Sequence, residues 1–237
     1  MDLKEHINFL VSQTLLEIRS KFKWEAFKNI SDPYERMDYL EETGTTFLGE
    51  GSGRQVYLLS SRYVLKLAHP GTYFKRGVAQ NEEEFNISQT SWAKDLVAHV
   101  QDHANDFSWI VSDLVRPLKN PGEFKALTGL EWSVFMGLLN FLEGQQDKLN
   151  SFTDLEEEIE EAEDEGDPEA KETKALMEVH QMMKSNPWIA KIVELILDSE
   201  IVVADLEEYD HWGKTADGRL VILDYGYSDD VKRKHYF

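Results

Sequence analysis

Residues 47–59 read FLGEGSGRQVYLL, and this stretch decides the fold. Gly49, Gly51 and Gly53 alternate with polar residues, and a β-rich run follows them directly. After a Ser-Ser turn comes a second β-rich run, residues 63–68. A dinucleotide-binding fold would place such glycines between a strand and a helix. The second strand instead predicts an antiparallel hairpin with a glycine-rich turn, whose backbone can approach a phosphate without a Cβ clash.

Lys66 stands in the middle of the second run, among alternating apolar residues. An ammonium group is costly to bury without a partner, so a carboxylate should lie nearby in space. Three consecutive glutamates follow in a helix that we predict over residues 81–95. In a protein kinase, a lysine in such a strand pairs with a glutamate of the following helix, and a resemblance of this kind would make Glu84 the partner of Lys66. Glu82 and Glu83 are alternatives that the sequence leaves open.

A second group of acidic residues lies near the C-terminus. Residues 220–226 read LVILDYG, a predicted apolar strand that ends in Asp224, an aromatic residue and a glycine. Upstream, Asp205 ends another apolar run and Asp210 follows it. Carboxylates are good ligands for Mg²⁺, whereas the neutral imidazole of the neighbouring His211 is a poor one for so hard an ion. The sequence leaves open whether Asp210 or His211 faces a metal.

The order of these features resembles the protein-kinase-like superfamily. Residues 76–84, RGVAQNEEE, and residues 211–226, HWGKTADGRLVILDYG, are similar to kinase-like proteins encoded by tailed bacteriophages. The resemblance covers only part of the chain, and the N-terminal segment and an acidic stretch lie outside it. It implies a bilobed α+β fold, with a small antiparallel N-lobe sheet and a reduced, mainly helical C-lobe.

The resemblance also implies a bound ATP. The glycine-rich turn and Val56 would cover the nucleotide, and Lys66 would hold its α- and β-phosphates. A strand and linker at residues 109–115 would lie beside it, with Asp113 and Val115 as contact residues.

Magnesium and the catalytic step are implied in the same way. Asp224, together with Asp210, would hold Mg²⁺ against the phosphates. Lys66 and Glu84 would position the nucleotide, and Asp205 would accept the proton of an acceptor hydroxyl.

The chain departs from the kinase pattern around the expected catalytic loop. Ala204 precedes Asp205 where kinases have Arg, and Glu207 stands where they have Lys. Only 11 residues follow Gly226, so we expect no peptide-substrate platform. Two functions fit: an Mg-ATP-dependent phosphotransferase of phage type with an unknown acceptor, or a noncatalytic pseudokinase that serves as a phage virion component or binds a host protein.

We expect three segments in the chain. Residues 1–45 form an N-terminal helical extension, with one helix from Asp2 and another from Asp32-Pro33. Residues 46–118 form the N-lobe and linker, and residues 119–237 the C-lobe. Within the C-lobe, apolar spacing predicts helices over residues 132–142, over residues 175–183 and from Asn186-Pro187 onward, and the Asp217-Gly218 pair predicts a hairpin turn.

Composition limits the class of protein. The 237 residues include 25 Lys and Arg against 45 Asp and Glu, a net charge of −20. Such a charge repels nucleic-acid phosphate and anionic lipid, so it disfavours nucleic acid as a partner. It allows a protein partner on an acidic surface, although acidity is first a means of solubility. No cysteine occurs, which excludes disulfides, Cys-ligated zinc and a thiol nucleophile. No membrane span or secretion signal is visible, so we expect a cytoplasmic protein, in a host cell or a virion if it is phage-encoded.

Two further patterns carry weaker predictions. Residues 154–170 form an acidic insertion, in which a thin apolar stripe of Leu155 and Ile159 predicts an exposed helix. His99 and His103 have the i, i+4 spacing of a helix, which can hold zinc, but no third ligand is evident. We therefore expect them on an exposed polar helix.

Overall fold

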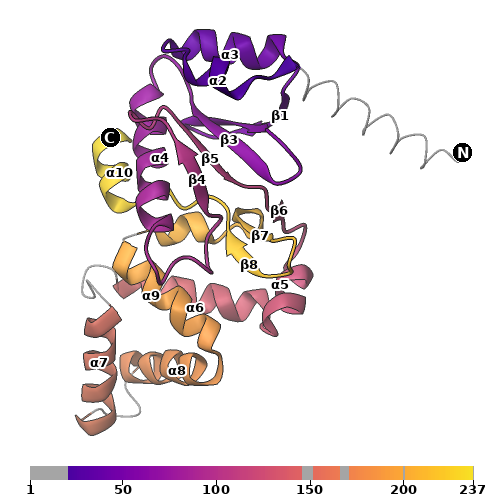
Figure 1. Ribbon diagram of the computed structural model, residues 1–237. Coiled ribbons are helices and arrows are strands. Elements are labelled where there is room, and N and C mark those ends of the chain that lie inside the picture. The colour runs from indigo at the N-terminus through magenta and orange to yellow at the C-terminus, as the bar shows by residue number, and fades with distance from the viewer. Residues whose placement is uncertain (1–20, 146–151, 166–170, 200, 237) are drawn as a thin grey trace, which may run out of the picture. The chain divides into compact units, whose positions relative to one another are not determined.

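A computed structural model describes residues 21–145, 152–165, 171–199 and 201–236 (Figure 1). The chain divides into two compact units. The first, here called the sheet unit, is Met1–Asn81 with Val100–Leu114. The second, the helical unit, is Glu82–His99 with Val115–Phe237. The protein is thus of mixed α+β class, with a small antiparallel sheet and several helices, as the sequence predicts.

The sheet unit is built on a five-stranded antiparallel sheet of order β1-β2-β3-β5-β4. The predicted hairpin around the glycines and the predicted strand at residues 107–114 are both present. The strands are β1 (Thr46–Glu50), β2 (Arg54–Leu58), β3 (Tyr63–Ala68), β4 (Val100–His103) and β5 (Trp109–Asp113).

One face of this sheet carries the unit's hydrophobic core. Leu65 and Leu67 of β3 are fully buried there, together with Phe27 of α2 (Trp24–Lys28) and Leu40 of α3 (Pro33–Glu42). Figure 1 shows α2 and α3 on this side of the sheet. Because side chains alternate along a strand, Lys66 points to the other face.

The predicted helix start at Asp32-Pro33 is confirmed by α3. The Asp32 carboxylate accepts hydrogen bonds from the backbone N–H groups of Tyr34 (2.8 Å) and Glu35 (3.1 Å), and Pro33 occupies the first helical position. The earlier predicted helix, from Asp2, lies outside the described residues.

The helix that carries the three glutamates is α4 (Phe74–Ser88), and the prediction of residues 81–95 for it is wrong at both ends. Its early turns contain Gly77, upstream of the predicted start. A Cβ at Gly77 would lie 2.2 Å from the Gly53 carbonyl oxygen and 2.8 Å from the Ala68 Cα. The glycine is therefore needed for the close approach of the helix to the sheet. The division between the two units falls within α4, after Asn81.

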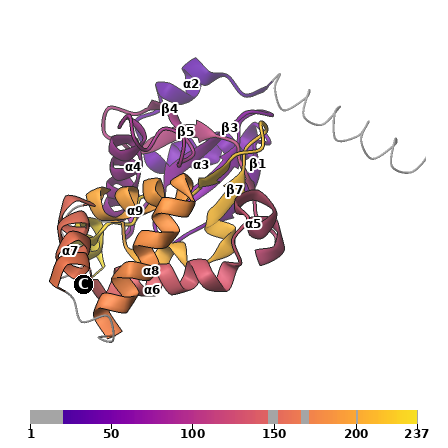
Figure 2. The same ribbon diagram turned by 90° about the horizontal axis from the view of Figure 1, so that it is seen from below.

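The helical unit combines helices with a short three-stranded sheet of order β6-β7-β8. Its α-helices are α5 (Pro121–Thr128), α6 (Trp132–Gln145), α7 (Phe152–Glu165), α8 (Lys171–Ser185), α9 (Pro187–Ser199) and α10 (Asp229–His235). Its strands are β6 (Arg116–Pro117), β7 (Trp212–Lys214) and β8 (Leu220–Ile222), and it has two 3₁₀ helices, η1 (Val203–Leu206) and η2 (Tyr209–His211). Figure 2 shows α6, α8 and α9 close to one another.

Several predictions for this unit are confirmed. Helices α6, α8 and α9 cover the ranges expected from apolar spacing, and α9 starts at Pro187 with Asn186 as its cap, whose side chain accepts from the Trp188 N–H at 3.1 Å. The Asp217-Gly218 turn joins β7 to β8, and Gly218 has a φ of 92°. On α9, Ile192 and Val193 are fully buried in the core of the unit.

The acidic stretch is less peripheral than predicted. Leu155 is fully buried and Ile159 is 3% exposed, and α7 packs against α8 and α9. Its apolar stripe is therefore part of the core, while the acidic side chains of Glu156 and Glu160 are exposed. Residues 166–170 of the predicted insertion lie outside the described residues.

The prediction of a helix at His99 and His103 is wrong. His103 belongs to β4, stacks on the Phe107 ring at 4.9 Å between centroids, and has Nδ1 3.0 Å from the Ala104 carbonyl oxygen. His99 Nδ1 lies 3.1 Å from the Ser88 carbonyl oxygen. The i, i+4 spacing of the two histidines does not reflect a helix here. His103 lies in β4, and the pairing of β4 with β5 determines its local structure.

Candidate functional site

The glycine-rich turn is anchored at one end and open at the other. The Gly51 N–H donates to the Arg54 carbonyl oxygen at 2.8 Å and closes the turn. Gly53 is buried against the start of α4, where an added Cβ would lie 3.0 Å from the Gly77 nitrogen. An added Cβ at Gly49 or Gly51 would meet no atom within 4 Å. These two glycines therefore leave free space above the turn, into which a ligand's phosphate could fit.

Strand register places Val56 and Lys66 together. Val56 of β2 pairs with Gly49 of β1 on one side and with Lys66 of β3 on the other. Directly paired residues of an antiparallel sheet have their side chains on the same face, so Val56 and Lys66 share the face opposite the core. Lys66 is only 7% exposed. A buried ammonium group at this position needs compensation by an anion or by polar atoms, as the sequence suggested.

A buried polar network, which sequence reasoning missed, holds the first half of α4 to the sheet. Arg54 is 4% exposed and Asn81 is fully buried. Arg54 Nη1 donates to the Asn81 Oδ1 at 3.4 Å, and the Asn81 Nδ2 donates to the Phe107 carbonyl oxygen at 2.8 Å. The signal in the sequence was weak: a single Asn directly before the glutamates.

The three candidate glutamates differ in burial. Glu82 is exposed, Glu83 is half-buried and Glu84 is fully buried. Removing a carboxylate from water is costly unless a cation or several hydrogen bonds compensate it. Of the three, Glu84 is therefore the one whose burial calls for a charged or polar partner.

The two expected linker residues lie in different surroundings. Asp113, at the end of β5, is half-buried and accepts a hydrogen bond from the Gln101 Nε2 at 3.0 Å. Val115 is 7% exposed in the core of the helical unit, and a Cβ at Gly213 would lie 2.7 Å from its Cγ1. The side chain of Val115 therefore contributes to packing, which leaves its backbone as the part able to contact a ligand.

The C-terminal acidic residues come together around one histidine. We call Asp205, Asp210, His211 and Asp224 the acidic cluster. His211 Nδ1 contacts the Asp205 carbonyl oxygen and lies 3.9 Å from the Asp205 Oδ1. The Leu223 N–H donates to the His211 carbonyl oxygen at 2.8 Å, which ties the end of β8, next to Asp224, to η2.

The carboxylates of the cluster change the acidity of His211. Burial disfavours the imidazolium, but the hydrogen bond to Asp205 and the charges of Asp205, Asp224 and Asp210 outweigh it, and the pKa of His211 is raised above its ordinary value of 6.5. An imidazole is a poor ligand for an ion as hard as Mg²⁺, whereas a carboxylate is a good one. Asp210 is therefore better suited than His211 to hold Mg²⁺.

Two buried aromatic residues position the segments of the cluster. Trp212 is fully buried, and its Nε1 donates to the Leu206 carbonyl oxygen at 2.9 Å. Tyr225 is also fully buried, and its hydroxyl donates to the Ala98 carbonyl oxygen. These bonds anchor the end of η1 and the residue directly after Asp224, so the segments that carry the carboxylates are tied to the core of the unit although the 3₁₀ helices are short.

Within the described part of the chain, no three His, Asp or Glu side chains are grouped so that they could hold a metal ion by themselves. Magnesium in phosphoryl-transfer sites needs fewer protein ligands. It keeps several waters and is held by one or two carboxylates together with substrate phosphates. The donors of Asp224 and Asp210 therefore fit Mg²⁺ that arrives with a nucleotide rather than a permanently bound ion.

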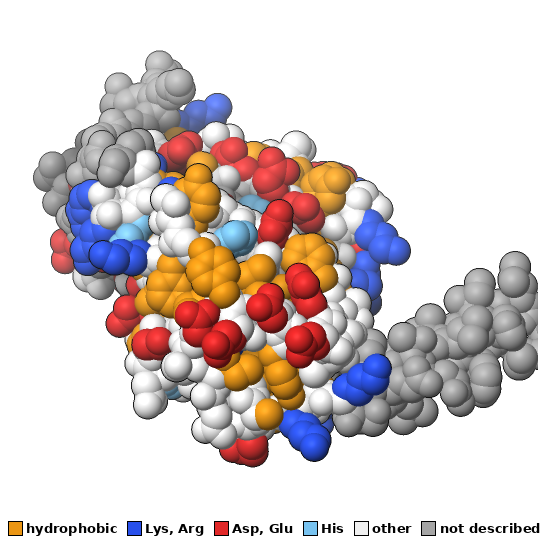
Figure 3. Space-filling model, turned by 90° about the horizontal axis from the view of Figure 1, so that it is seen from above, with side chains coloured by type: hydrophobic (Ala, Val, Ile, Leu, Met, Phe, Trp, Pro, Cys, Tyr) orange, Lys and Arg blue, Asp and Glu red, His pale blue; other side chains and the backbone are white. Residues whose placement is uncertain are grey.

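Figure 3 shows a further group of acidic side chains on the face seen from above, where they lie among exposed hydrophobic ones. On α3, Glu35, Asp38 and Glu41 are exposed. The cation of this helix, Arg36, is buried and donates to the Ile30 carbonyl oxygen at 2.7 Å, so it does not offset them at the surface.

The comparisons with known proteins found no relatives: no protein-family model, no curated protein and no solved structure matches the chain. Among the described residues, no helix is both long enough and apolar enough to span a membrane.

Proposed function

We propose that this chain is an Mg-ATP-binding, kinase-like phosphotransferase. The observation that carries the proposal is Lys66, a buried lysine in a central strand. Lys66 shares a sheet face with Val56, its partner in β2. Val56 in turn pairs with Gly49 of β1, the glycine beside which the space is open. A lysine of this kind is how kinases hold the α- and β-phosphates of ATP, under a glycine-rich turn whose backbone approaches the phosphates.

In this proposal the two units contribute different groups to one nucleotide. The sheet unit supplies the turn of Gly49 and Gly51, the apolar surface of Val56 and the charge of Lys66. The helical unit supplies Glu84, whose full burial suits it to compensate a lysine, and the carboxylates of Asp224 and Asp210 for Mg²⁺.

The transfer step assigns a role to Asp205. An acceptor hydroxyl attacks the γ-phosphorus, the bond from that phosphorus to the bridging oxygen breaks, and ADP leaves with the electron pair. The proton of the hydroxyl passes to the Asp205 carboxylate. Asp205 is 25% exposed at its side chain, so an acceptor from solvent can reach it.

A noncatalytic pseudokinase is the second candidate, and specific residues favour it. Glu207 adds a negative charge two residues after Asp205, where phosphoryl transfer gains from a positive one, and Ala204 removes a usual anchor. In that case the chain would transfer no phosphoryl group and would act as a phage virion component or a host-protein interactor, through an acidic surface such as that of α3. Both candidates go with a cytoplasmic protein, which would be in a host cell or a virion if the chain is phage-encoded.

Thermal unfolding tests the proposal. We compare the wild type, Lys66→Ala and Lys94→Ala with and without saturating Mg-ATP; Lys94 is exposed and serves as the matched control. At about 100 times its Kd a ligand stabilises the native state by roughly 2.7 kcal/mol, which raises Tm visibly. We expect this shift in the wild type and in Lys94→Ala, and its loss in Lys66→Ala. No shift in the wild type contradicts the phosphotransferase, and a shift without ATP turnover favours the pseudokinase.

A further inference from the structure

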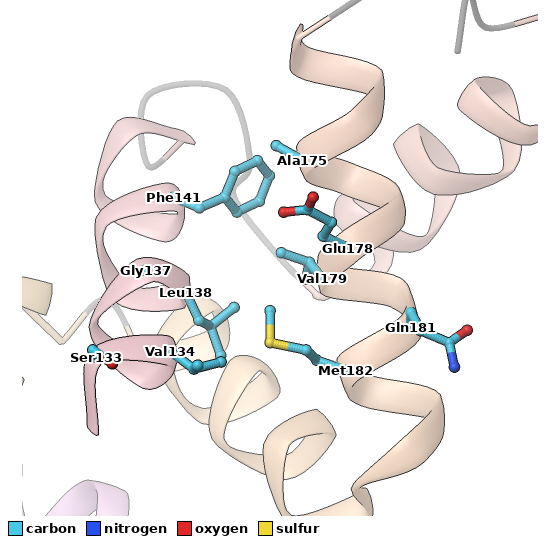
Figure 4. A pocket seen from close by; sticks show the side chains of 10 residues that line it. All are labelled: Ser133, Val134, Gly137, Leu138, Phe141, Ala175, Glu178, Val179, Gln181 and Met182. Carbon is cyan, nitrogen blue, oxygen red and sulfur yellow. The ribbon is translucent and has the colours of Figure 1, made fainter. Parts of the chain in front are cut away.

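Two pockets of the helical unit differ in the chemistry of their walls. The first lies between α6 and α8 (Figure 4), and the one charged side chain among its described lining residues, Glu178, has its Oε1 4.0 Å from the Lys174 Nζ. The second, here called the α5–α9 pocket, is bounded by the end of α5, the first turns of α9 and the turn between β7 and β8. Its volume is about 480 Å³, within the range of ligand-binding clefts. Its walls, unlike those of the first, contain polar groups that need a partner.

Apolar side chains form part of the wall of the α5–α9 pocket. Leu96 is 2% exposed and Leu220 is 7% exposed, and both belong to the core of the unit. Leu127 and Trp188 also line the pocket and pack, partly buried, against that core. The Trp188 ring lies 5.8 Å from the Trp212 ring between centroids, which supports it from behind. A ligand of this pocket therefore needs an apolar or aromatic body.

The indole N–H of Trp188 is a donor without an acceptor. Its Nε1 is buried and has no hydrogen-bond partner among the described residues. The rings of Phe124 and Phe135 beside it offer only the weak acceptor of a π face. By contrast, the Nε1 of Trp212 in the same aromatic group donates to the Leu206 carbonyl oxygen at 2.9 Å. A buried N–H that lacks an acceptor costs free energy, which an oxygen atom of a ligand would recover.

Two cations line the same pocket. Lys191 of α9 is exposed and makes no ion pair within the described part of the chain. Arg219 donates through Nη1 to the Asp95 Oδ1 at 3.3 Å and through Nε to the Asp217 Oδ2 at 2.8 Å, and a guanidinium has further N–H donors. Among the described residues that line the pocket, Asp95 carries the one carboxylate, and Arg219 already engages it. The pocket of this acidic chain therefore has more donors than acceptors.

We propose that the α5–α9 pocket binds a small organic acid, an aromatic or branched aliphatic body with one carboxylate. The body would lie against the apolar wall, and the carboxylate would accept from the Lys191 ammonium and the Trp188 N–H, which are neighbours on α9 because they are three residues apart. A carboxylate suits the pocket better than a phosphate ester, which carries up to two negative charges, because Lys191 supplies one positive charge and Asp95 lies in the same wall. The inference does not depend on the nucleotide site, because none of the candidate residues of that site lines this pocket.

The test uses para-fluorophenylacetate as the probe, and its binding to the full chain is measured by fluorine NMR. The amide of the same acid is the neutral probe of matching shape. Lys191→Gln removes the ammonium, and Lys191→Arg keeps the charge. Lys119→Gln is the matched control, because Lys119 is an exposed lysine of the same unit that does not line the pocket. Trp188→Phe removes the N–H and keeps an aromatic ring.

We expect the wild type to bind the acid about tenfold more tightly than the amide, as the gain of one charge-assisted hydrogen bond predicts. Lys191→Gln should weaken binding of the acid about tenfold and Trp188→Phe severalfold, whereas Lys191→Arg and Lys119→Gln should bind it as the wild type does.

Three results would overturn the proposal: no binding of the acid by the wild type, equal binding of the acid and the amide, or equal effects of Lys191→Gln and Lys119→Gln. The last result would mean that the acid associates with lysines of the surface in general. Circular dichroism confirms that each variant is folded. Because Lys191 is exposed, Lys191→Gln keeps the proposal testable even where Trp188→Phe does not fold.

Discussion

The glycine-rich turn with Lys66 and the acidic cluster around His211 are held in place by different means. In the sheet unit, strand pairing fixes the position of each residue: Gly49, Val56 and Lys66 form one row across three strands. In the helical unit, the cluster stands on two short 3₁₀ helices and the end of a three-residue strand, and buried aromatic side chains hold them. The pairing of β1, β2 and β3 joins neighbouring segments of the sequence in a regular register. The acidic cluster instead depends on contacts between residues that are far apart in the sequence, such as Tyr225 and Ala98.

This difference predicts where each region is most sensitive to substitution. The turn depends on close backbone contact between the sheet and α4, so it should fail when a single methyl group is added there. The cluster depends on a balance of charges around one imidazole, so it should respond to pH.

The larger effect is expected at Gly77. Gly77→Ala places a Cβ 2.2 Å from the Gly53 carbonyl oxygen, so the helix must move away from the turn. Overpacking of this kind costs roughly 1–3 kcal/mol, although alanine in an open helix interior stabilises by up to about 1 kcal/mol. Urea unfolding measures the change, and Gly137→Ala, with no atom near the added Cβ, is the control that should be stabilised. A stabilised Gly77→Ala variant would show that the contact with Gly53 is not maintained in solution.

The smaller effect is the pH dependence of the helical unit. The pKa of His211 is raised by Asp205, Asp224 and Asp210 against the effect of burial, so folding favours its protonated form. The resulting stability is fully present below the ordinary pKa of 6.5 and is lost as the pH rises through the raised value.

We therefore expect the wild type to lose stability relative to His211→Gln as the pH rises from about 5 to 8, measured by urea unfolding at each pH. The His211→Gln variant lacks this titration, and its profile should be flatter in the same range. If the difference between the two proteins stays constant, or grows with pH, the three carboxylates do not act on His211 as the structure indicates.

How much the sequence could predict follows from the same contrast. The hairpin at Gly49–Lys66, the start of α3 and the helices α6, α8 and α9 were predictable, because periodicity and capping residues act over a few positions. The start of α4 was not, because the packing that makes Gly77 necessary involves Gly53 and Ala68, which the sequence does not place beside it. The strand at His103 was missed for the same reason, since its pairing with β5 outweighs a helical spacing of two histidines.

For the candidate site, the chemical types of the residues were easier to predict than their burial and their neighbours in space. The sequence pointed to Lys66, Glu84 and Asp224 as chemical groups, but three adjacent glutamates are equivalent until burial separates them. Likewise, the sequence did not show that Asp205, Asp210 and Asp224 act together on His211, because only the fold brings these four residues together. The role of Val115 in packing had no sequence signal, because an apolar residue in a linker can face either a ligand or a core.

The central proposal is that Lys66 and Asp224 each contribute to binding of Mg-ATP, and ATP binding with and without Mg²⁺ tests it most directly. Calorimetric titration is done on the wild type, Lys66→Ala and Asp224→Asn. We predict that Mg²⁺ strengthens ATP binding to the wild type, that Asp224→Asn removes this Mg²⁺ dependence, and that Lys66→Ala weakens binding in both conditions. An Asp224→Asn variant that keeps the full Mg²⁺ dependence, or a Lys66→Ala variant that binds as the wild type does, would contradict the account.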